Sequence, residues 1–429
     1  MKYPLSFLVF SAWLVGCGPV VETNETSASG SGGAGASGAG GSGSSGGWSG
    51  VGGFDAGPSA LCEPLTKPSV DMLPLCGSGD APCQILEEEL LAVPPAYRND
   101  APALSLDAVC NPRILFSSAE GEYKGFFAVR KAVGDWEVNP TPFPVAAAGL
   151  VSVAPDLPVA LVNDGAFGAS LWSFSAAGWD LVENVPKEGT NLVRGFAIGN
   201  TGELFAGFRG PADELLFGRY GSSWSVETLG GTPFPFPVAV SPEGAPHLVA
   251  WEVVNGAWEI HWHAPPLAHE VAMPLGSGTL QADAYRLALA ATAADAANPQ
   301  GKPHVLALRQ LPDFTFELVY MTREGKNAWT ATPLDEVPQG STVYPLGIVT
   351  DAAGAVRLFY SRFEIGAPTT GRLVVAAPHP GGITQAVVTE GFAAFGATFD
   401  RDGAGRIHVA LYELGTMSDV GIRYLVLGP

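Results

Sequence analysis

The chain has 429 residues, of which 22 are basic and 42 acidic, giving a formal net charge of −20. This charge excludes binding to nucleic-acid backbones, which depends on Lys and Arg side chains displacing counterions. Hydrophobic residues make up 47% of the chain and charged residues 15%, so a large core can be buried and a fully disordered chain is excluded. The 55 glycines and 36 prolines exclude a helical bundle and favour short strands joined by many turns.

The first 17 residues have the features of an export signal. Lys2 supplies a positive charge, and the apolar run Leu5–Val15 ends in Leu14-Val15-Gly16-Cys17. A run of this length is too short to span a bilayer and is typical of a signal peptide. The last four of these residues resemble the lipobox of bacterial lipoproteins. The resemblance implies that residues 1–16 are removed and that the Cys17 thiol carries diacylglycerol; an ordinary secretory signal is the alternative.

A flexible tether is expected behind the anchor, over residues 17–60. From Gly18 to Ala60, 15 of the 43 residues are glycine and most of the others are small or polar. Such a segment cannot bury enough apolar surface to fold. Because two or three acyl chains on one residue anchor a protein stably, we expect a membrane-bound protein of the cell envelope. The outer membrane is the expected location, with the protein facing the periplasm or the cell surface.

The remaining cysteines are Cys62, Cys76, Cys83 and Cys110. An even number in an exported chain predicts two disulfides of unknown pairing. A zinc site is the alternative, but the segment has neither a Cys-x-x-Cys pair nor a histidine. We interpret residues 61–101 as a disulfide-bonded neck that joins the tether to the repeat domain. Within it, Gln84–Leu91 is expected to be a short helix whose acidic triplet faces solvent.

From residue 102 to 429 the chain repeats itself. One recurring element is a Trp that opens an alternating segment, and a second is a turn glycine followed by a strand. The two series are Trp136, Trp179, Trp224 and Trp329, and Gly202, Gly244, Gly301, Gly354 and Gly405. One period is expected to hold four short strands: Phe196–Ile198, Glu203–Phe208, Glu214–Tyr220 and Trp224–Leu229.

Four antiparallel strands in each repeat of about 40–50 residues predict an all-β fold, a β-propeller. Repeat starts near residues 103, 146, 195, 237, 284, 346 and 394 indicate seven blades, with six or eight as alternatives. The last repeat has only three strands before the chain stops. We therefore expect a segment within Tyr97–Ala108 to complete that blade and cover its edge. The repeats resemble divergent exported propellers with a turn-Gly-x-x-His pattern.

The third residue after four of the turn glycines is His247, His304, Arg357 or His408. Such a ring of donors could bind an anionic or hydroxyl-rich ligand. The alternative, which we favour, is a hydrogen bond inside each repeat that ties the turn to a neighbouring strand. The four repeated Trp residues also have two interpretations, packing between adjacent blades or stacking on sugar rings, and we favour packing.

No metal, cofactor or catalytic residue is assigned from the sequence. His261-x-His263 places two imidazoles on one strand face with His269 nearby, but no carboxylate is fixed beside them, so we expect a partly exposed face. Asp400-x-Asp402-Gly403 lacks the further acids of a calcium loop and is expected to be a polar turn. The loop acids are scattered, and the sequence does not show which converge; they are Asp156, Asp164, Asp213, Asp295, Asp313, Glu364 and Asp419.

These observations predict a monomeric, lipid-anchored propeller that binds a glycan or a protein partner without catalysis. Two alternatives remain. An envelope polysaccharide hydrolase or lyase would need carboxylates from several blade loops to converge. A structural scaffold of an envelope assembly would show a large exposed apolar patch.

Overall fold

The computed structural model describes residues 75–77, 83–91 and 101–429, except for short gaps at 108, 119–123, 146, 155, 164–167, 187–190, 231–236, 256, 267, 277–285, 312–314, 339, 352 and 415–419. The chain divides into two units, Met1–Gly46 and Gly47–Pro429, and every described residue belongs to the second. The expected signal peptide, Cys17, the tether and Cys62 lie outside the described residues. No helix that could span a membrane occurs in the described part of the chain.

The described residues form 28 strands in seven antiparallel sheets of four strands each. The first three sheets hold four consecutive strands each, in the order blade 1, blade 2 and blade 3: β2 (Ala103–Leu106), β3 (Pro112–Ser117), β4 (Lys124–Ala132) and β5 (Asp135–Pro144); β6 (Ala147–Ala154), β7 (Leu157–Asn163), β8 (Ala169–Ser175) and β9 (Gly178–Asn184); β10 (Asn191–Ile198), β11 (Leu204–Arg209), β12 (Leu215–Tyr220) and β13 (Trp224–Gly230).

Blades 4, 5 and 6 are built in the same way: β14 (Val238–Val240), β15 (Pro246–Val254), β16 (Ala257–Ala264) and β17 (Ala268–Gly276); β18 (Leu287–Thr292), β19 (Lys302–Gln310), β20 (Phe316–Gly325) and β21 (Ala328–Val337); β22 (Ser341–Thr350), β23 (Val356–Glu364), β24 (Ala367–His379) and β25 (Gly382–Glu390). Blade 7 joins both ends of the described chain: β26 (Ala393–Arg401), β27 (Ile407–Leu414), β28 (Val420–Gly428) and β1 (Gln84–Leu91).

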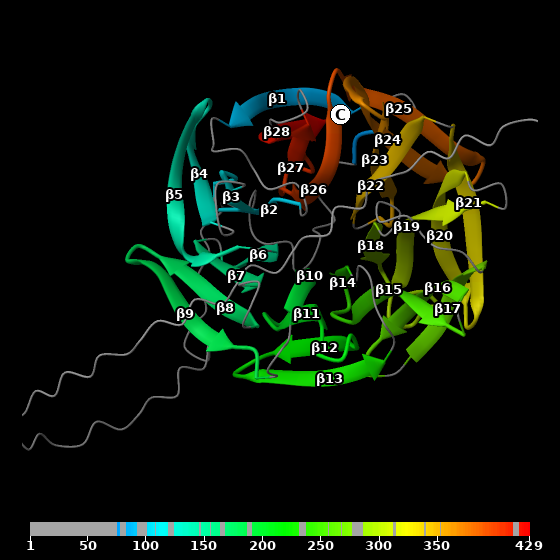
Figure 1. The fold of residues 1–429 in the computed structure, drawn as a ribbon, viewed down its shortest axis with the longest axis horizontal. Helices are drawn as coiled ribbons and strands as arrows, with labels where there is room; N and C mark the ends of the chain where they lie inside the picture. The colour runs from blue at the N-terminus through cyan, green and yellow to red at the C-terminus, as the bar shows by residue number, and fades with distance from the viewer. Residues whose placement is uncertain are drawn as a thin grey trace, which may run out of the picture. The chain divides into compact units, whose positions relative to one another are not determined.

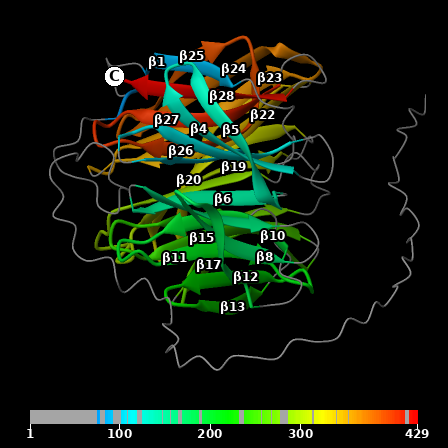
Figure 2. The ribbon, with the colours of Figure 1, turned by 90° about the vertical axis from the view of Figure 1, so that its left-hand side faces the viewer.

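The seven sheets stand around a common axis as a β-propeller (Figure 1). The first strand of each blade contacts the first strands of the two neighbouring blades, and the series closes when β26 meets β2. Figure 2 shows the ring from the side, with the strands running between its two faces. The predicted fold class and the count of seven blades are therefore confirmed, and the observed blades begin within a few residues of the predicted repeat starts.

The apolar core is divided among the seven seams between adjacent blades. Successive residues of a strand point to opposite faces of its sheet, so each strand supplies two seams. Val249 and Trp251 of β15 pack against blade 5, whereas Leu248 and Ala250 of the same strand pack against blade 3. Each of the seven apolar clusters of the described residues likewise contains side chains from two adjacent blades.

The repeated glycines occupy the turn between the first two strands of a blade. Gly301 and Gly405 have φ of 101° and 79°, in the left-handed region that glycine adopts without a steric penalty. Each closes its turn by donating its backbone N–H to the carbonyl three residues earlier, on Asn298 and Asp402. The turn series noted in the sequence therefore marks the same structural position in successive blades.

The closing strand differs from the prediction. Gln84–Leu91 is a strand, not a helix, and it pairs antiparallel with β28, from Gln84 opposite Gly428 to Leu91 opposite Ile422. The segment Tyr97–Ala108 does not complete blade 7, because Ala103–Leu106 within it is the innermost strand of blade 1. Part of the segment expected to be a neck thus belongs to the propeller.

The acidic triplet of β1 faces solvent only in part: Glu88 is exposed, whereas the Glu89 side chain is buried. Strand alternation sends Glu87 and Glu89 toward blade 1, where both carboxylates bind the Arg130 guanidinium, and sends Glu88 to Arg423. Glu89 Oε2 also accepts a hydrogen bond of 2.6 Å from the Trp136 indole. The contacts of Glu87 and Glu89 join blade 7 to blade 1.

A disulfide between Cys76 and Cys83 lies just before β1. Leu75, Cys76 and Cys83 pack in the apolar cluster of blades 6 and 7. Cys110 is also disulfide-bonded. The predicted use of these three cysteines in disulfides is confirmed.

The ion pair of Arg130 and Glu89 is expected to hold the ring closed. Both side chains are 8% exposed. Removing one partner of a buried pair leaves an uncompensated charge, so Arg130→Ala should lower the unfolding free energy by about 3 kcal/mol in urea titrations. The neighbouring Lys131 pairs with Glu137 at the exposed surface, and Lys131→Ala should leave the unfolding free energy nearly unchanged. Equal urea midpoints for the two variants would contradict this assignment.

Candidate functional site

The four residues after the turn glycines lie inside the propeller. His304 and His408 are 5% and 3% exposed, and each donates or accepts through both ring nitrogens. His304 binds Thr292 Oγ1 at 2.9 Å and Tyr320 Oη at 2.6 Å. His408 makes the same bond to Tyr424 Oη, also at 2.6 Å, and its second nitrogen binds Asp402 at 3.2 Å.

His247 and Arg357 are equally enclosed. The Trp262 indole donates to His247 Nδ1 at 3.1 Å, and His247 Nε2 lies 2.9 Å from the Gln300 carbonyl oxygen, to which it donates. Arg357 donates to the backbone carbonyls of Leu75 and Cys76, next to the disulfide. The four side chains belong to separate blades and bind partners within the protein. This geometry favours the hydrogen-bonding interpretation over a shared ligand site.

The buried histidines make stability pH-dependent. Burial lowers the pKa of His247 to about 4 and of His304 to about 3. An unfolded histidine has a pKa near 6.5, so below about pH 6.5 protons bind the unfolded chain first and the unfolding free energy falls. His304→Gln removes one of these titrations, and the urea midpoint should therefore decrease less steeply between pH 6.5 and 4 than in the wild type. The same slope in both proteins would contradict this effect.

The repeated tryptophans pack within the propeller. Trp136 contacts Tyr424 of blade 7, Trp179 contacts Phe127 of blade 1, and Trp329 contacts Trp262 of blade 4, with ring centroids 5.5, 5.0 and 6.0 Å apart. Trp224 packs against Phe208 of its own blade, in the cluster shared by blades 2 and 3. All four lie at the start of the outermost strand of a blade. Packing between blades accounts for their recurrence.

The other candidates are local contacts. Asp402 accepts hydrogen bonds from the Arg406 backbone N–H and guanidinium, at 2.9 and 2.6 Å, as a polar turn requires. Among the scattered loop acids, Asp156 pairs with Arg113, Asp213 with Arg209, and Asp295 accepts hydrogen bonds from Asn298. Asp164, Asp313 and Asp419 lie outside the described residues. Of the loop acids that the structure describes, Glu364 lines a cavity between blades 5 and 6.

A groove of about 920 Å³ opens at the seam between blades 5 and 6. Its wall is formed by strands β21, β22, β23, β24 and β25, and its polar lining residues are Asp335, Ser341, Tyr360, Arg362, Glu364, Thr369, Thr370, Arg372, Gln385 and Glu390. We call this cavity the 5–6 groove. Sequence reasoning missed it, apart from Glu364, because it depends on how two blades meet.

The floor of the 5–6 groove is fixed by bonds between the blades. Arg362 Nη1 of β23 lies 2.9 and 3.1 Å from the two carboxylate oxygens of Asp335 on β21. Burial raises the pKa of Asp335, although Arg362 opposes that shift. Gln385 accepts a hydrogen bond from Tyr360 Oη at 2.9 Å and donates one to the Leu334 carbonyl oxygen at 2.7 Å. These polar groups are therefore held in place before any ligand arrives.

The rim of the 5–6 groove is solvent-exposed and polar. Arg372 and Glu390 form an ion pair of 3.3 Å in which both side chains are more than half exposed. Thr369, Thr370 and Glu364 are exposed beside it. The groove thus holds two guanidinium groups and three carboxylates, with one net negative charge. Such a cavity offers both hydrogen-bond donors and hydrogen-bond acceptors. It has no excess positive charge that would attract an anionic ligand.

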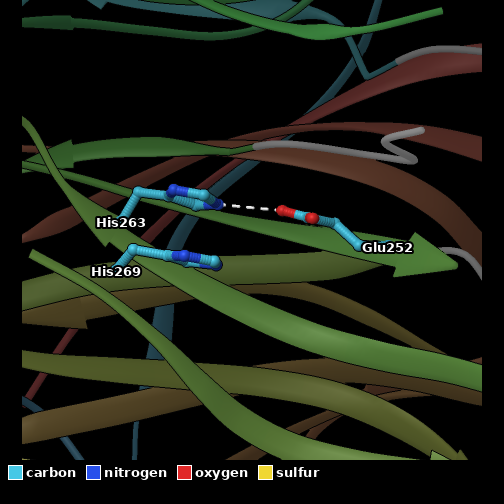
Figure 3. A group of neighbouring side chains, drawn as sticks. All are labelled: Glu252, His263 and His269. Carbon is cyan, nitrogen blue, oxygen red and sulfur yellow. Dashed lines mark hydrogen bonds and ion pairs between the residues drawn. The ribbon is translucent and has the colours of Figure 1, made fainter. Parts of the chain in front are cut away.

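A second polar group, the blade 4 cluster, consists of Glu252, Glu259, His261, His263 and His269. Glu252 of β15 lies opposite Glu259 of β16, and His263 of β16 lies opposite His269 of β17. Figure 3 shows the His263 and His269 rings side by side, both directed toward the Glu252 carboxylate. His261 and His263 are 4% and 2% exposed, so the expectation of a partly exposed strand face was wrong for both. The sequence prediction also missed the two carboxylates.

Short polar contacts connect the blade 4 cluster. His263 Nε2 lies 2.9 Å from Glu252 Oε1, and His261 Nε2 lies 2.8 Å from Glu259 Oε2. The second nitrogen of His261, Nδ1, lies 2.6 Å from His269 Nε2. Burial would raise the pKa of Glu252, but the hydrogen bond from His263 and the nearby imidazoles outweigh it and hold that pKa below its usual range.

Known proteins share the fold but not the sequence. No protein-family model and no curated protein matches this chain. The crystal structure of polysaccharide lyase Uly1 superposes with a TM-score of 0.56 at 8% identity, covering 80% of this chain and 99% of the lyase. An ulvan lyase of a new polysaccharide lyase family gives 0.49 at 11% identity, with coverage of 80% and 95%. Aleuria aurantia lectin gives 0.36 at 13% identity, with coverage of 77% and 96%. The likeness to Uly1 shows a common propeller fold.

Proposed function

We propose that this protein is a lipid-anchored cell-envelope protein whose propeller binds a neutral glycan in the 5–6 groove without catalysis. The observation that carries the proposal is the groove itself, a preformed cavity of about 920 Å³ lined by ion pairs, hydroxyls and an amide. Ligand sites are typically concave, and a few fixed polar groups in them set the orientation of the ligand.

The charge of the 5–6 groove selects the class of glycan. Sugar hydroxyls both donate and accept hydrogen bonds, which suits a cavity where guanidinium groups and carboxylates alternate. A sulfated or uronic polymer would meet a net negative groove on a chain of charge −20 and would be repelled. The exposed Val387 and the half-buried Ala386 offer an apolar wall for the C–H face of a sugar ring.

The pairing of the charged groups supports binding rather than catalysis. Asp335 is held by Arg362, and Glu390 is held by Arg372. A general acid or base must be available to exchange a proton with the substrate, whereas Asp335 already accepts hydrogen bonds from Arg362 and Glu390 is ion-paired with Arg372, which leaves Glu364 as the third carboxylate of the groove. A glycan would therefore meet fixed acceptors and donors.

The proposal predicts that glycan binding depends on the groove rim. On an array of neutral and anionic polysaccharides, the full-length Cys17→Ser chain should bind neutral glycans and release no products. Arg372→Ala removes a charged hydrogen-bond donor, worth about 1.5–3 kcal/mol, and should weaken binding at least about tenfold. Arg219→Ala removes a comparable exposed arginine, paired with Glu203 on blade 3, and should leave binding unchanged.

Three results would contradict this proposal. Product release would identify a hydrolase or lyase, equal binding by Arg372→Ala and the wild type would place the ligand elsewhere, and preferential binding of anionic polymers would contradict the charge argument. Binding to no glycan at all would leave the protein-ligand or scaffold alternatives.

The anchor is tested separately. Cys17→Ser should move the protein from the membrane fraction to the soluble fraction and remove the mass of the acyl chains from the mature protein, because lipidation requires the thiol. Ser11→Ala, in the apolar run, leaves the thiol in place and should remain in the membrane fraction. A Cys17→Ser protein that stays in the membrane after high-salt washing would contradict lipid anchoring.

A further inference from the structure

The blade 4 cluster has the ligands of a transition-metal site. Imidazole nitrogens and carboxylate oxygens are ligands that Zn²⁺ takes in proteins, and a structural zinc site has four of them. One possible ligand atom each from Glu252, His263 and His269 lie within 4.8 Å of one another. His261 lies next to this group and can supply a fourth ligand, because its Nδ1 lies 2.6 Å from His269 Nε2 and 3.8 Å from Glu252 Oε2.

Tetrahedral coordination sets the separation expected between neighbouring ligand atoms. Zinc bonds of about 2.0–2.2 Å place neighbouring tetrahedral ligand atoms roughly 3.3 Å apart. The measured separations are 2.6 Å between His261 and His269, 2.9 Å between His263 and Glu252, and 3.8 Å between His261 and Glu252. Glu252, His263 and His269 form the group whose ligand atoms all lie within 4.8 Å of one another, and His261 would join it by rotation of its side chain.

Glu259 orients one of the ligands from behind. His261 Nε2 lies 2.8 Å from Glu259 Oε2, so Nε2 carries the proton that is donated to the carboxylate. The lone pair of the neutral ring is then on Nδ1, the nitrogen that faces His269 and Glu252. A carboxylate that accepts the second N–H of a histidine is the usual support of a metal-bound imidazole.

The fold shields the cluster on one side and opens it on the other. Leu248 and Ala250 precede Glu252 on the same face of β15 and pack against Phe217 of blade 3, which gives the cluster an apolar inner neighbour. His269 is exposed on the outermost strand of the blade and provides the path by which an ion enters. The rings of His263 and His269 are stacked nearly parallel with their centroids 4.4 Å apart, so one of them must rotate before both nitrogen lone pairs point at one ion.

From this geometry we infer that blade 4 binds one Zn²⁺ ion, or a divalent transition metal of similar preference, through Glu252, His261, His263 and His269. Four protein ligands close the coordination shell, so the role is structural. The ion joins β15, β16 and β17 at the outer end of the seam with blade 3. This site is in a different blade from the 5–6 groove and does not depend on glycan binding.

The test uses the full-length Cys17→Ser chain, purified without a histidine tag and stripped with a chelator. Isothermal titration with ZnCl₂ should show one ion per chain, and zinc should raise the melting temperature. X-ray absorption at the zinc edge should show nitrogen and oxygen neighbours at about 2.0–2.2 Å and no sulfur near 2.3 Å. His269→Ala should weaken binding by at least a hundredfold, and because His269 is exposed its replacement opens no cavity.

Two further variants test the positioning role of Glu259 and the specificity of the site. Glu259→Gln should weaken zinc binding by about 10- to 100-fold while the coordination shell stays the same, as expected for a positioning residue. His379 is an exposed histidine on blade 6, and His379→Ala should bind zinc like the wild type. Absence of one-to-one binding in the wild type, equal affinity in His269→Ala, or equal loss in His379→Ala would overturn the site and leave a hydrogen-bonded cluster.

Discussion

The ring depends on the antiparallel pairing of β1 with β28. Blade 7 draws only β26, β27 and β28 from the C-terminal end of the chain, and without a fourth strand the backbone N–H and C=O groups of β28 would form an open edge. β1 covers that edge, and its Glu87 and Glu89 side chains reach Arg130 in blade 1. One strand thus completes a sheet and joins the last blade to the first.

The two candidate sites follow from the way the blades meet. Alternating side chains fill each seam with apolar residues, but neighbouring blades radiate from the axis and separate toward their outer strands (Figure 1). Charged side chains occur at these outer ends. At the seam of blades 4 and 5, Arg323 binds Glu270 and stacks on Trp262. At the seam of blades 5 and 6 the charged side chains line an open groove instead, and on blade 4 histidines gather around a buried carboxylate.

Much of this fold was predictable because its signals are local. The turn glycines recur in five blades and the tryptophans that open outer strands in four, and together with the period-2 alternation they were enough for the fold class, the blade count and the four strands of blade 3. The segment Gln84–Leu91 was not predictable in the same way. Its glutamates and leucines favour a helix in isolation, and the β28 edge that makes it a strand is more than 300 residues away in the chain.

The two candidate sites also depend on contacts between residues that are distant in the sequence. His261-x-His263 was visible in the sequence, but the carboxylates required the register of the β15–β16 hairpin. Asn255-Gly256, a two-residue hairpin signal, could have supplied it, because counting outward from that turn places Glu252 opposite Glu259. The 5–6 groove had no such signal, since Asp335 and Arg362 meet only when blades 5 and 6 pack together.

Hydrogen–deuterium exchange of the intact protein tests the ring closure most directly. If β1 completes blade 7, the backbone amides of Gln84–Leu91 that pair with β28 should be protected to the same degree as those of β28, and both strands should open together. Rapid exchange throughout Gln84–Leu91, with β26, β27 and β28 still protected, would show a free N-terminal segment and contradict the closed seven-bladed ring.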